Sequence, residues 1–232
     1  MTRRLTTLAA LVAASGLAAP AHGQTSRSDP TDVQSWYGAG LQLDLPHKWE
    51  ASADYRLRMI GNASHYRGSY VTGELGYAVR KHVSLFANYR FADVTEDGIA
   101  HRFGVGVDGS RKWLGTTVSF RPQVQHRLAG TDDEQGGDGD AKTVWRTRLQ
   151  LKRPLTNALD VYASTEPYFD FAASYPVDNW RNTLGMKYEY APGKKLDLFY
   201  IYRPDYAKSY NRTFHVVGMS LDFDAKLGRG RR

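Results

Sequence analysis

Hydrophobic and polar side chains alternate with a period of two along most of this chain. Residues 143–152 show the pattern clearly, with Thr, Trp, Thr, Leu and Leu on one face and Val, Arg, Arg, Gln and Lys on the other. After a short turn, residues 159–170 alternate again. This periodicity predicts β-strands with one apolar and one polar face. Each arm is close to the roughly 9–11 residues with which a tilted strand crosses a bilayer.

The same hairpin recurs along the chain and predicts one architecture. Its short connections, at 46–48, 80–82, 110–112, 153–158 and 191–195, alternate with longer ones. Bacterial outer-membrane barrels place short turns in the periplasm and longer loops outside the cell. We therefore predict an all-β fold, an antiparallel up-and-down transmembrane β-barrel. The expected strands are 33–45, 49–60, 70–79, 83–91, 101–109, 113–128, 143–152, 159–170, 180–190, 196–202 and 213–223.

The number of strands is the open question in this prediction. Eleven are visible, whereas bacterial barrels usually have an even number. We expect about 12, within a range of 10–12, with the additional strand inside residues 24–32 or those residues threading the lumen. A soluble β-sandwich is the alternative fold, but its outer face would carry solvent charges, often Lys. Here the polar faces carry Arg together with Asp and Glu, which favours the barrel.

The N-terminus carries the features of a secretory signal peptide. Arg3 and Arg4 precede an apolar stretch at 5–19, and Ala21-His22-Gly23 offers a cleavage site. An N-terminal membrane anchor is the alternative, but the apolar run is shorter than a spanning helix needs. We expect a signal peptide at 1–23, an N-terminal segment at 24–32, the barrel at 33–223 and a basic tail at 224–232. Cleavage would lower the net charge from +7 to +5.

Composition narrows the class of protein further. The mean hydropathy of −0.53 and the absence of any apolar run of spanning length exclude a helical membrane protein. A barrel tolerates both, because half of each strand faces a polar interior. There is no Cys, so disulfides and thiolate metal sites are excluded. The Arg residues are scattered, which argues against nucleic-acid binding. The 15 Tyr and 5 Trp suit aromatic girdles at two membrane interfaces.

Several short motifs, in a fixed order, resemble a known family. They are Asp54-Tyr55-Arg56-Leu57-Arg58, Gly76-Tyr77, Asn88-Tyr89-Arg90, Arg146-Thr147-Arg148-Leu149-Gln150, Glu166-Pro167-Tyr168-Phe169 and Trp180-Arg181-Asn182. The chain resembles the Gram-negative outer-membrane proteins grouped as domain of unknown function 2490. The resemblance implies a barrel in the cell outer membrane and supplies no activity, substrate or catalytic residues. Expected partners are the bilayer, lipopolysaccharide and the outer-membrane assembly machinery.

The charged residues of the polar faces allow two interpretations. Basic and acidic side chains are nearly balanced, which suits an ion-pair network that fills the lumen of a structural barrel. The small basic excess suits a narrow diffusion pore with a mild anion preference, as in pores lined by Arg or Lys. In either case the residues expected to line the lumen are Arg56, Arg58, Arg90, Arg146, Arg148, Glu166 and Arg181.

An enzymatic alternative rests on His82 and Ser84. A His and a Ser two residues apart share a strand face in outer-membrane lipid hydrolases, and Asn88 is nearby. Against this, His82 lies in an expected periplasmic turn, and both side chains face the expected lumen. The acidic loop at 129–142 contains Asp132-Asp133-Glu134 and could bind Ca²⁺, but its spacing fits no metal loop. We therefore expect no cofactor and no metal site.

Overall fold

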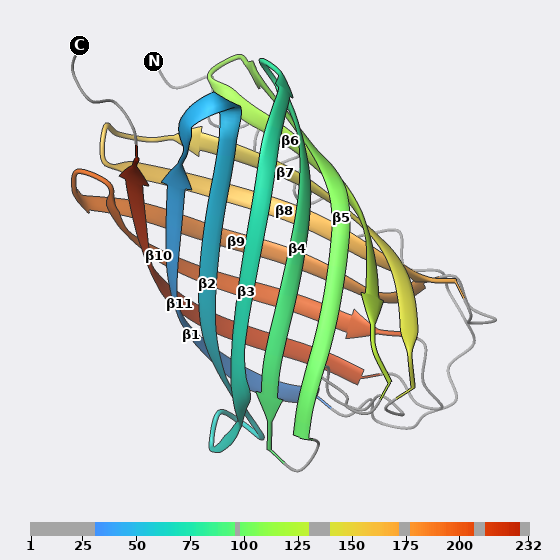
Figure 1. Ribbon diagram of the computed structural model, residues 1–232. Coiled ribbons are helices and arrows are strands. Elements are labelled where there is room, and N and C mark those ends of the chain that lie inside the picture. Colours follow the sequence, from blue (N-terminus) through green and yellow to red (C-terminus); the bar gives the residue numbers. More distant parts are fainter. Residues whose placement is uncertain (1–30, 96–97, 130–139, 172–176, 207–211, 228–232) are drawn as a thin grey trace.

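The chain folds into a closed β-barrel in which every strand is hydrogen-bonded to two others (Figure 1). This computed structural model describes residues 31–95, 98–129, 140–171, 177–206 and 212–227. The strands are β1 (Thr31–Asp44), β2 (Trp49–Ile60), β3 (His65–Arg80), β4 (Val83–Val94), β5 (Gly98–Trp113), β6 (Thr116–Arg127), β7 (Lys142–Pro154), β8 (Leu159–Asp170), β9 (Val177–Ala191), β10 (Lys194–Asp205) and β11 (Arg212–Lys226).

Neighbouring strands in sequence pair antiparallel, and one short 3₁₀ turn, η1 (Pro46–Lys48), joins β1 to β2. The predicted all-β up-and-down barrel is therefore confirmed. Among the described residues, no helix is long and apolar enough to cross a membrane.

The barrel closes through one parallel pair. β1 lies beside β11 in register from Thr31↔Thr213 to Asp44↔Lys226. The reason is arithmetic: with eleven strands in the described part of the chain, the first and the last run in the same direction. The count lies within the predicted range. Of residues 24–32, where a twelfth strand was sought, Thr31 and Asp32 belong to β1, and 24–30 lie outside the described residues.

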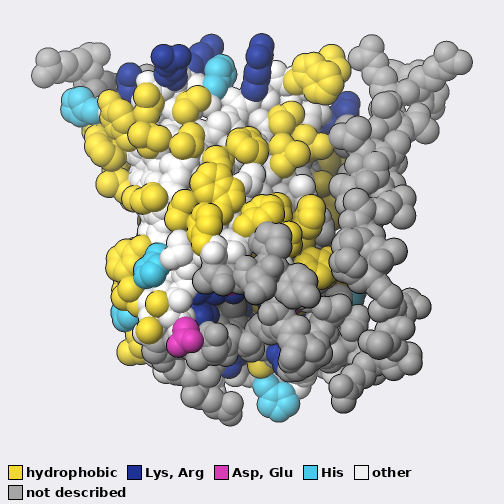
Figure 2. Space-filling view, turned by 90° about the vertical axis from the view of Figure 1, so that its right-hand side faces the viewer, with side chains coloured by type: hydrophobic (Ala, Val, Ile, Leu, Met, Phe, Trp, Pro, Cys, Tyr) yellow, Lys and Arg dark blue, Asp and Glu magenta, His cyan; other side chains and the backbone are white. Residues whose placement is uncertain are grey.

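Apolar side chains cover the outside of the barrel and polar ones fill the inside. Trp145 and Leu149 of β7 are 37% and 43% exposed, whereas Arg146 and Arg148, between them on the same strand, are half-buried. The predicted alternation is therefore present in this strand. Figure 2 shows hydrophobic side chains spread over the wall and Lys and Arg gathered along the upper rim, at the end of the barrel that carries the short turns.

One turn differs from the prediction. β5 extends through the expected turn at 110–112, and Leu114-Gly115, with φ of 47° and 78°, joins it to β6 instead. Two consecutive residues with positive φ form the tight hairpin turn whose twist matches the strands. Leu rarely adopts a positive φ, so the residue types at 114–115 do not predict this turn.

The strands also extend further toward the loop end than expected. The predicted loop at 61–69 is a turn at 61–64, and β4 and β5 continue to Val94 and from Gly98. Ala92, Val94 and Ala100 are at most 4% exposed and pack with Tyr70. These apolar side chains lie on the inward face, so they break the alternation of apolar outward and polar inward residues. Because the strand prediction depends on that alternation, it ends these strands too early.

The first and last strands are slightly longer than expected. β1 begins at Thr31 rather than residue 33, and β11 continues past Phe223 to Lys226, into the expected tail. The signal peptide at 1–23, the acidic residues 130–139 and tail residues 228–232 lie outside the described residues.

The outward orientation of Leu149 leads to a stability prediction. Leu149→Arg should lower the free energy of unfolding in lipid vesicles by about 2–4 kcal/mol, because an outward charge near the middle of a strand lies in the hydrocarbon layer of a barrel that spans a membrane. Leu155→Arg is the matched control, since Leu155 is exposed in the β7–β8 turn. Urea titration followed by the gel shift of the folded barrel measures both. Equal effects of the two substitutions would contradict the outward placement of Leu149.

Candidate functional site: an arginine cluster in the lumen

Toward the turn end, the interior charges are balanced across the barrel. Lys187 of β9 lies 3.2 Å from Asp197 of β10 and 2.7 Å from Asp222 of β11. Tyr162 of β8 donates a hydrogen bond of 2.9 Å to Asp197. Because one strand separates β9 from β11 and β8 from β10, the bonds to Asp222 and from Tyr162 pass over an intervening strand on the inner side of the barrel.

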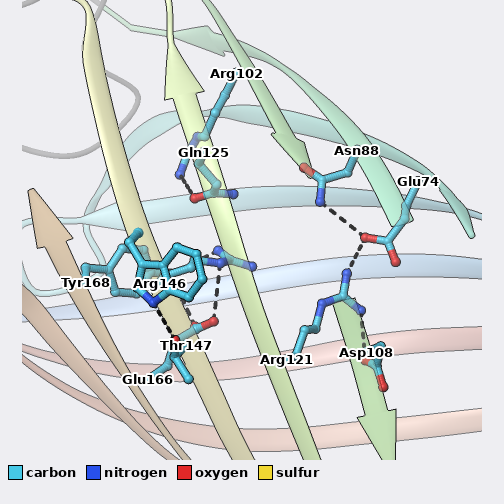
Figure 3. A network of polar contacts seen from close by, with 11 residues as sticks. Glu74, Asn88, Arg102, Asp108, Arg121, Gln125, Arg146, Thr147, Glu166 and Tyr168 are labelled. Atoms are coloured by element: carbon cyan, nitrogen blue, oxygen red, sulfur yellow. Dashed lines mark hydrogen bonds and ion pairs between the residues drawn. The ribbon is translucent and has the colours of Figure 1, made fainter. Parts of the chain in front are cut away.

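A second balanced network lies on the opposite strands (Figure 3). Arg121 of β6 pairs with Glu74 of β3 and, at 3.4 Å, with Asp108 of β5. Asn88 donates a 3.3 Å hydrogen bond to the same Glu74 carboxylate. The Arg121 guanidinium also lies 3.7 Å from the centre of the Phe86 ring. Each cation in these two networks is therefore matched by carboxylates.

Further toward the loop end, the pairing changes character. Arg90 of β4 lies directly opposite Arg102 of β5, and Arg102 lies directly opposite Arg127 of β6. Arg127 is in turn opposite Lys142 of β7. A similar like-charge pair joins Arg121 to Arg148. Like charges directly opposite each other on neighbouring strands destabilise a sheet. Lys142 is paired with Asp170 at 3.1 Å and with Asp178 at 2.7 Å. The opposed arginines Arg90, Arg102 and Arg127 are therefore the part of this row that simple ion-pair filling explains poorly.

Aromatic rings hold other interior arginines in place. Arg58 lies 4.2 Å from the ring centre of Trp36 and 4.0 Å from that of Tyr70. Arg181 lies 4.6 Å from the ring centre of Tyr168. Stacking on a ring face stabilises a guanidinium without cancelling its charge, as a carboxylate would. These contacts let positive charge accumulate inside the barrel.

One carboxylate, that of Glu166, lies among the arginines and is 9% exposed. Arg146 Nε is 3.3 Å from Glu166 Oε1, and Arg146 Nη1 donates a 3.0 Å hydrogen bond to the Tyr168 hydroxyl. Tyr168 in turn donates a 3.2 Å hydrogen bond to Glu166 Oε2 (Figure 3). Arg181 is directly opposite Glu166 on β9. One acid thus shares its charge among several cations.

We use the term arginine cluster for Arg58, Arg90, Arg102, Arg146, Arg148 and Arg181. Five of its members are among the residues expected to line the lumen. Of the other two on that list, Glu166 lies within the cluster, and Arg56 makes a 3.3 Å ion pair with Asp54. The structure brings these residues into one region of the interior, where the field of each acts on its neighbours.

Sequence reasoning left three members of this site out of its list. Arg102, Trp36 and Tyr168 all lie on inward positions, and Trp36 and Tyr168 are each 1% exposed. Strand parity could have found Trp36, because it alternates with the apolar outward set of Val33, Tyr37 and Leu41. Arg102 could have been found from its position opposite Arg90 once the hairpin register was known.

The loop half of the interior is tightly packed. Trp36 packs with Ile201 and Val216. Phe214 is 1% exposed and lies beneath Arg203, whose guanidinium is 4.2 Å from the centre of the Phe214 ring. Arg203 and Asp205 form a buried two-point pair, with both N–O distances 3.1 Å. Any passage through this half must run between side chains in close contact.

A cavity of about 460 Å³ opens at the turn end and reaches inward to Phe86 and Arg121. His82 and Ser84 both line it, His82 as an exposed turn residue. Within the described chain, no hydrogen bond joins their side chains and no carboxylate contacts the His82 ring. No group of three or more His, Asp or Glu side chains among the described residues is placed to hold a metal ion.

The chain belongs to the family described as protein of unknown function DUF2490, whose model matches residues 33–213. No curated protein matches the sequence. The fold is similar to a solved structure of the NanC porin, with 12% sequence identity, a TM-score of 0.50, and coverage of 74% of this chain and 86% of the porin chain. It is also similar to a bacterial polysaccharide outer-membrane secretin, at 7% identity, TM-score 0.46 and 72% coverage of each chain.

The two kinds of arginine should respond differently to neutralisation. Arg203→Gln should lower the free energy of unfolding by about 3–5 kcal/mol, because it leaves the buried Asp205 carboxylate without its two-point partner. Arg90→Gln loses one hydrogen bond to Thr72 but removes the repulsion from Arg102, so its effect should stay within about 1 kcal/mol. Urea unfolding in vesicles measures both. A larger loss for Arg90→Gln would show that the like-charge row is stabilising.

Proposed function

We propose that this protein is an outer-membrane β-barrel that forms a narrow, water-filled passage with a mild preference for small anions. The observation that carries the proposal is the opposition of like charges at Arg90, Arg102 and Arg127 on three neighbouring strands. A barrel selected for stability alone gains from matched pairs, such as those around Lys187. Like charges directly opposite each other cost stability, and a lumen lined by arginine suits the passage of anions.

The outer membrane is the proposed location. The apolar outer wall, the absence of a free strand edge and the expected signal peptide at 1–23 support it. A membrane requires this closure, because no water is present to satisfy an open edge. The wall would contact the bilayer and, in the outer leaflet, lipopolysaccharide. Assembly machinery would recognise the last strand, in which Val217, Met219 and Leu221 face outward.

A closed structural barrel is the second candidate. It is favoured by the tight packing of Trp36, Tyr70, Tyr168 and Phe214, each 1% exposed, in the loop half. In this case the arginine stacks act as a plug. The hydrolase alternative has the least support, since His82 and Ser84 share a cavity but have no described carboxylate to orient the imidazole.

Conductance distinguishes the two main candidates. Protein reconstituted in planar bilayers under a KCl gradient should conduct with a reversal potential on the anion-selective side. Arg146→Ala combined with Arg148→Ala should lower the anion-to-cation permeability ratio by about fivefold, because a unit charge about 4 Å from a passing ion is worth about 1 kcal/mol even in water.

The matched control removes two interior cations that acids already balance, Lys152→Ala with Lys187→Ala. This control should shift the permeability ratio less than the arginine pair. Silence of the wild-type protein at all voltages would support the closed barrel instead. Equal shifts in the two double variants would remove the arginine cluster as the source of selectivity.

A further inference from the structure

Glu166 and the arginines around it have the composition of an oxyanion site that already holds an occupant. The Glu166 carboxylate contacts Arg146 and accepts the Tyr168 hydrogen bond. Its charge also acts on Arg148 and Arg181. In the described part of the chain, Arg148 has one further acid within range, Asp108. One carboxylate therefore serves guanidinium groups from two flanking strands, β7 and β9.

The resident carboxylate does not fully satisfy these donors. Although Arg146 Nε is 3.3 Å from Glu166 Oε1, it is buried and donates no hydrogen bond to any described acceptor. A buried donor without an acceptor costs free energy, more so when it is charged. The guanidinium groups of two arginines are forked donors that a carboxylate can accept at two points, and the tyrosine hydroxyl adds a further donor.

We propose that Arg146, Arg148, Arg181 and Tyr168 form a binding site for carboxylate-bearing solutes, and that Glu166 is its internal competitor. A solute carboxylate would displace Glu166 from Arg146 and then leave as Glu166 returns. Conduction requires binding that is strong enough to admit an ion and weak enough to release it. Competition from Glu166 thus sets how tightly the site binds a solute. This role rests on the proposed passage, whereas the binding site itself does not.

Acetate reproduces the end of the Glu166 side chain and serves as the probe. Glu166→Ala should open a vacancy that acetate fills, so acetate should raise the thermal midpoint of the folded barrel saturably. The concentration for half of this effect should be at least about tenfold lower than for the wild-type protein, in which Glu166 competes. Acetamide and equal concentrations of chloride separate carboxylate binding from polarity and ionic strength.

Asp222→Ala is the matched control variant. It removes an interior carboxylate of the turn half, but Lys187 keeps its second partner Asp197 at 3.2 Å. Acetate should therefore not stabilise this variant more than the wild-type protein. An absent acetate effect in Glu166→Ala, or an equal one in Asp222→Ala, would overturn the proposal.

If Glu166→Ala does not fold, Glu166→Gln tests the same site, because it keeps the side-chain shape and removes the charge. Its current should be more anion-selective than the wild type and should saturate at lower chloride concentration; an unchanged profile overturns the proposal. Acetate stabilisation of Glu166→Ala in a protein that never conducts would reject the passage while retaining the site. Conduction by the wild type, together with no acetate stabilisation of Glu166→Ala, would retain the passage and reject the site.

Discussion

Closure of the sheet, which leaves none of the described strands with an unpaired edge, is the constraint on which the whole structure depends. Ten antiparallel contacts and one parallel contact meet it. The parallel contact brings β1 close to β11, and glycines make room on the inward side. A Cβ at Gly40 would lie 3.0 Å from Asp222 Oδ1, and one at Gly38 would lie 3.3 Å from Ser220 Oγ, both on β11. A side chain at either position would require these β11 side chains to shift.

Closure creates an interior that the chain fills in two ways. Around Lys187 and Arg121, cations meet carboxylates from strands one to three places away in the barrel. Around Arg58 and Arg181, guanidinium groups lie against aromatic rings. The lumen therefore carries the arginine cluster toward the loop end and carboxylate-paired cations toward the turn end, a division that a simple count of acids and bases does not reveal.

The sequence predicted the barrel because one physical rule, apolar out and polar in, holds for most of each strand. It holds for Trp145, Arg146 and Leu149, and the arginine cluster could be anticipated from the same rule. The prediction failed where another constraint prevailed. Ala92, Val94 and Ala100 turn inward to pack with Tyr70, so their strands looked like loops. The opposition of Arg90 and Arg102 depends on register, which periodicity does not specify.

The odd number of described strands has a consequence for where the chain enters and leaves the barrel. Thr31 starts β1 at the loop rim, whereas Lys226 ends β11 at the turn rim, beside Asp44. In a barrel that spans a membrane, the polypeptide enters and leaves its wall on different sides. Reporters fused before β1 and after β11 would then sample separate compartments, unlike those on an even-stranded barrel, whose two ends share one side.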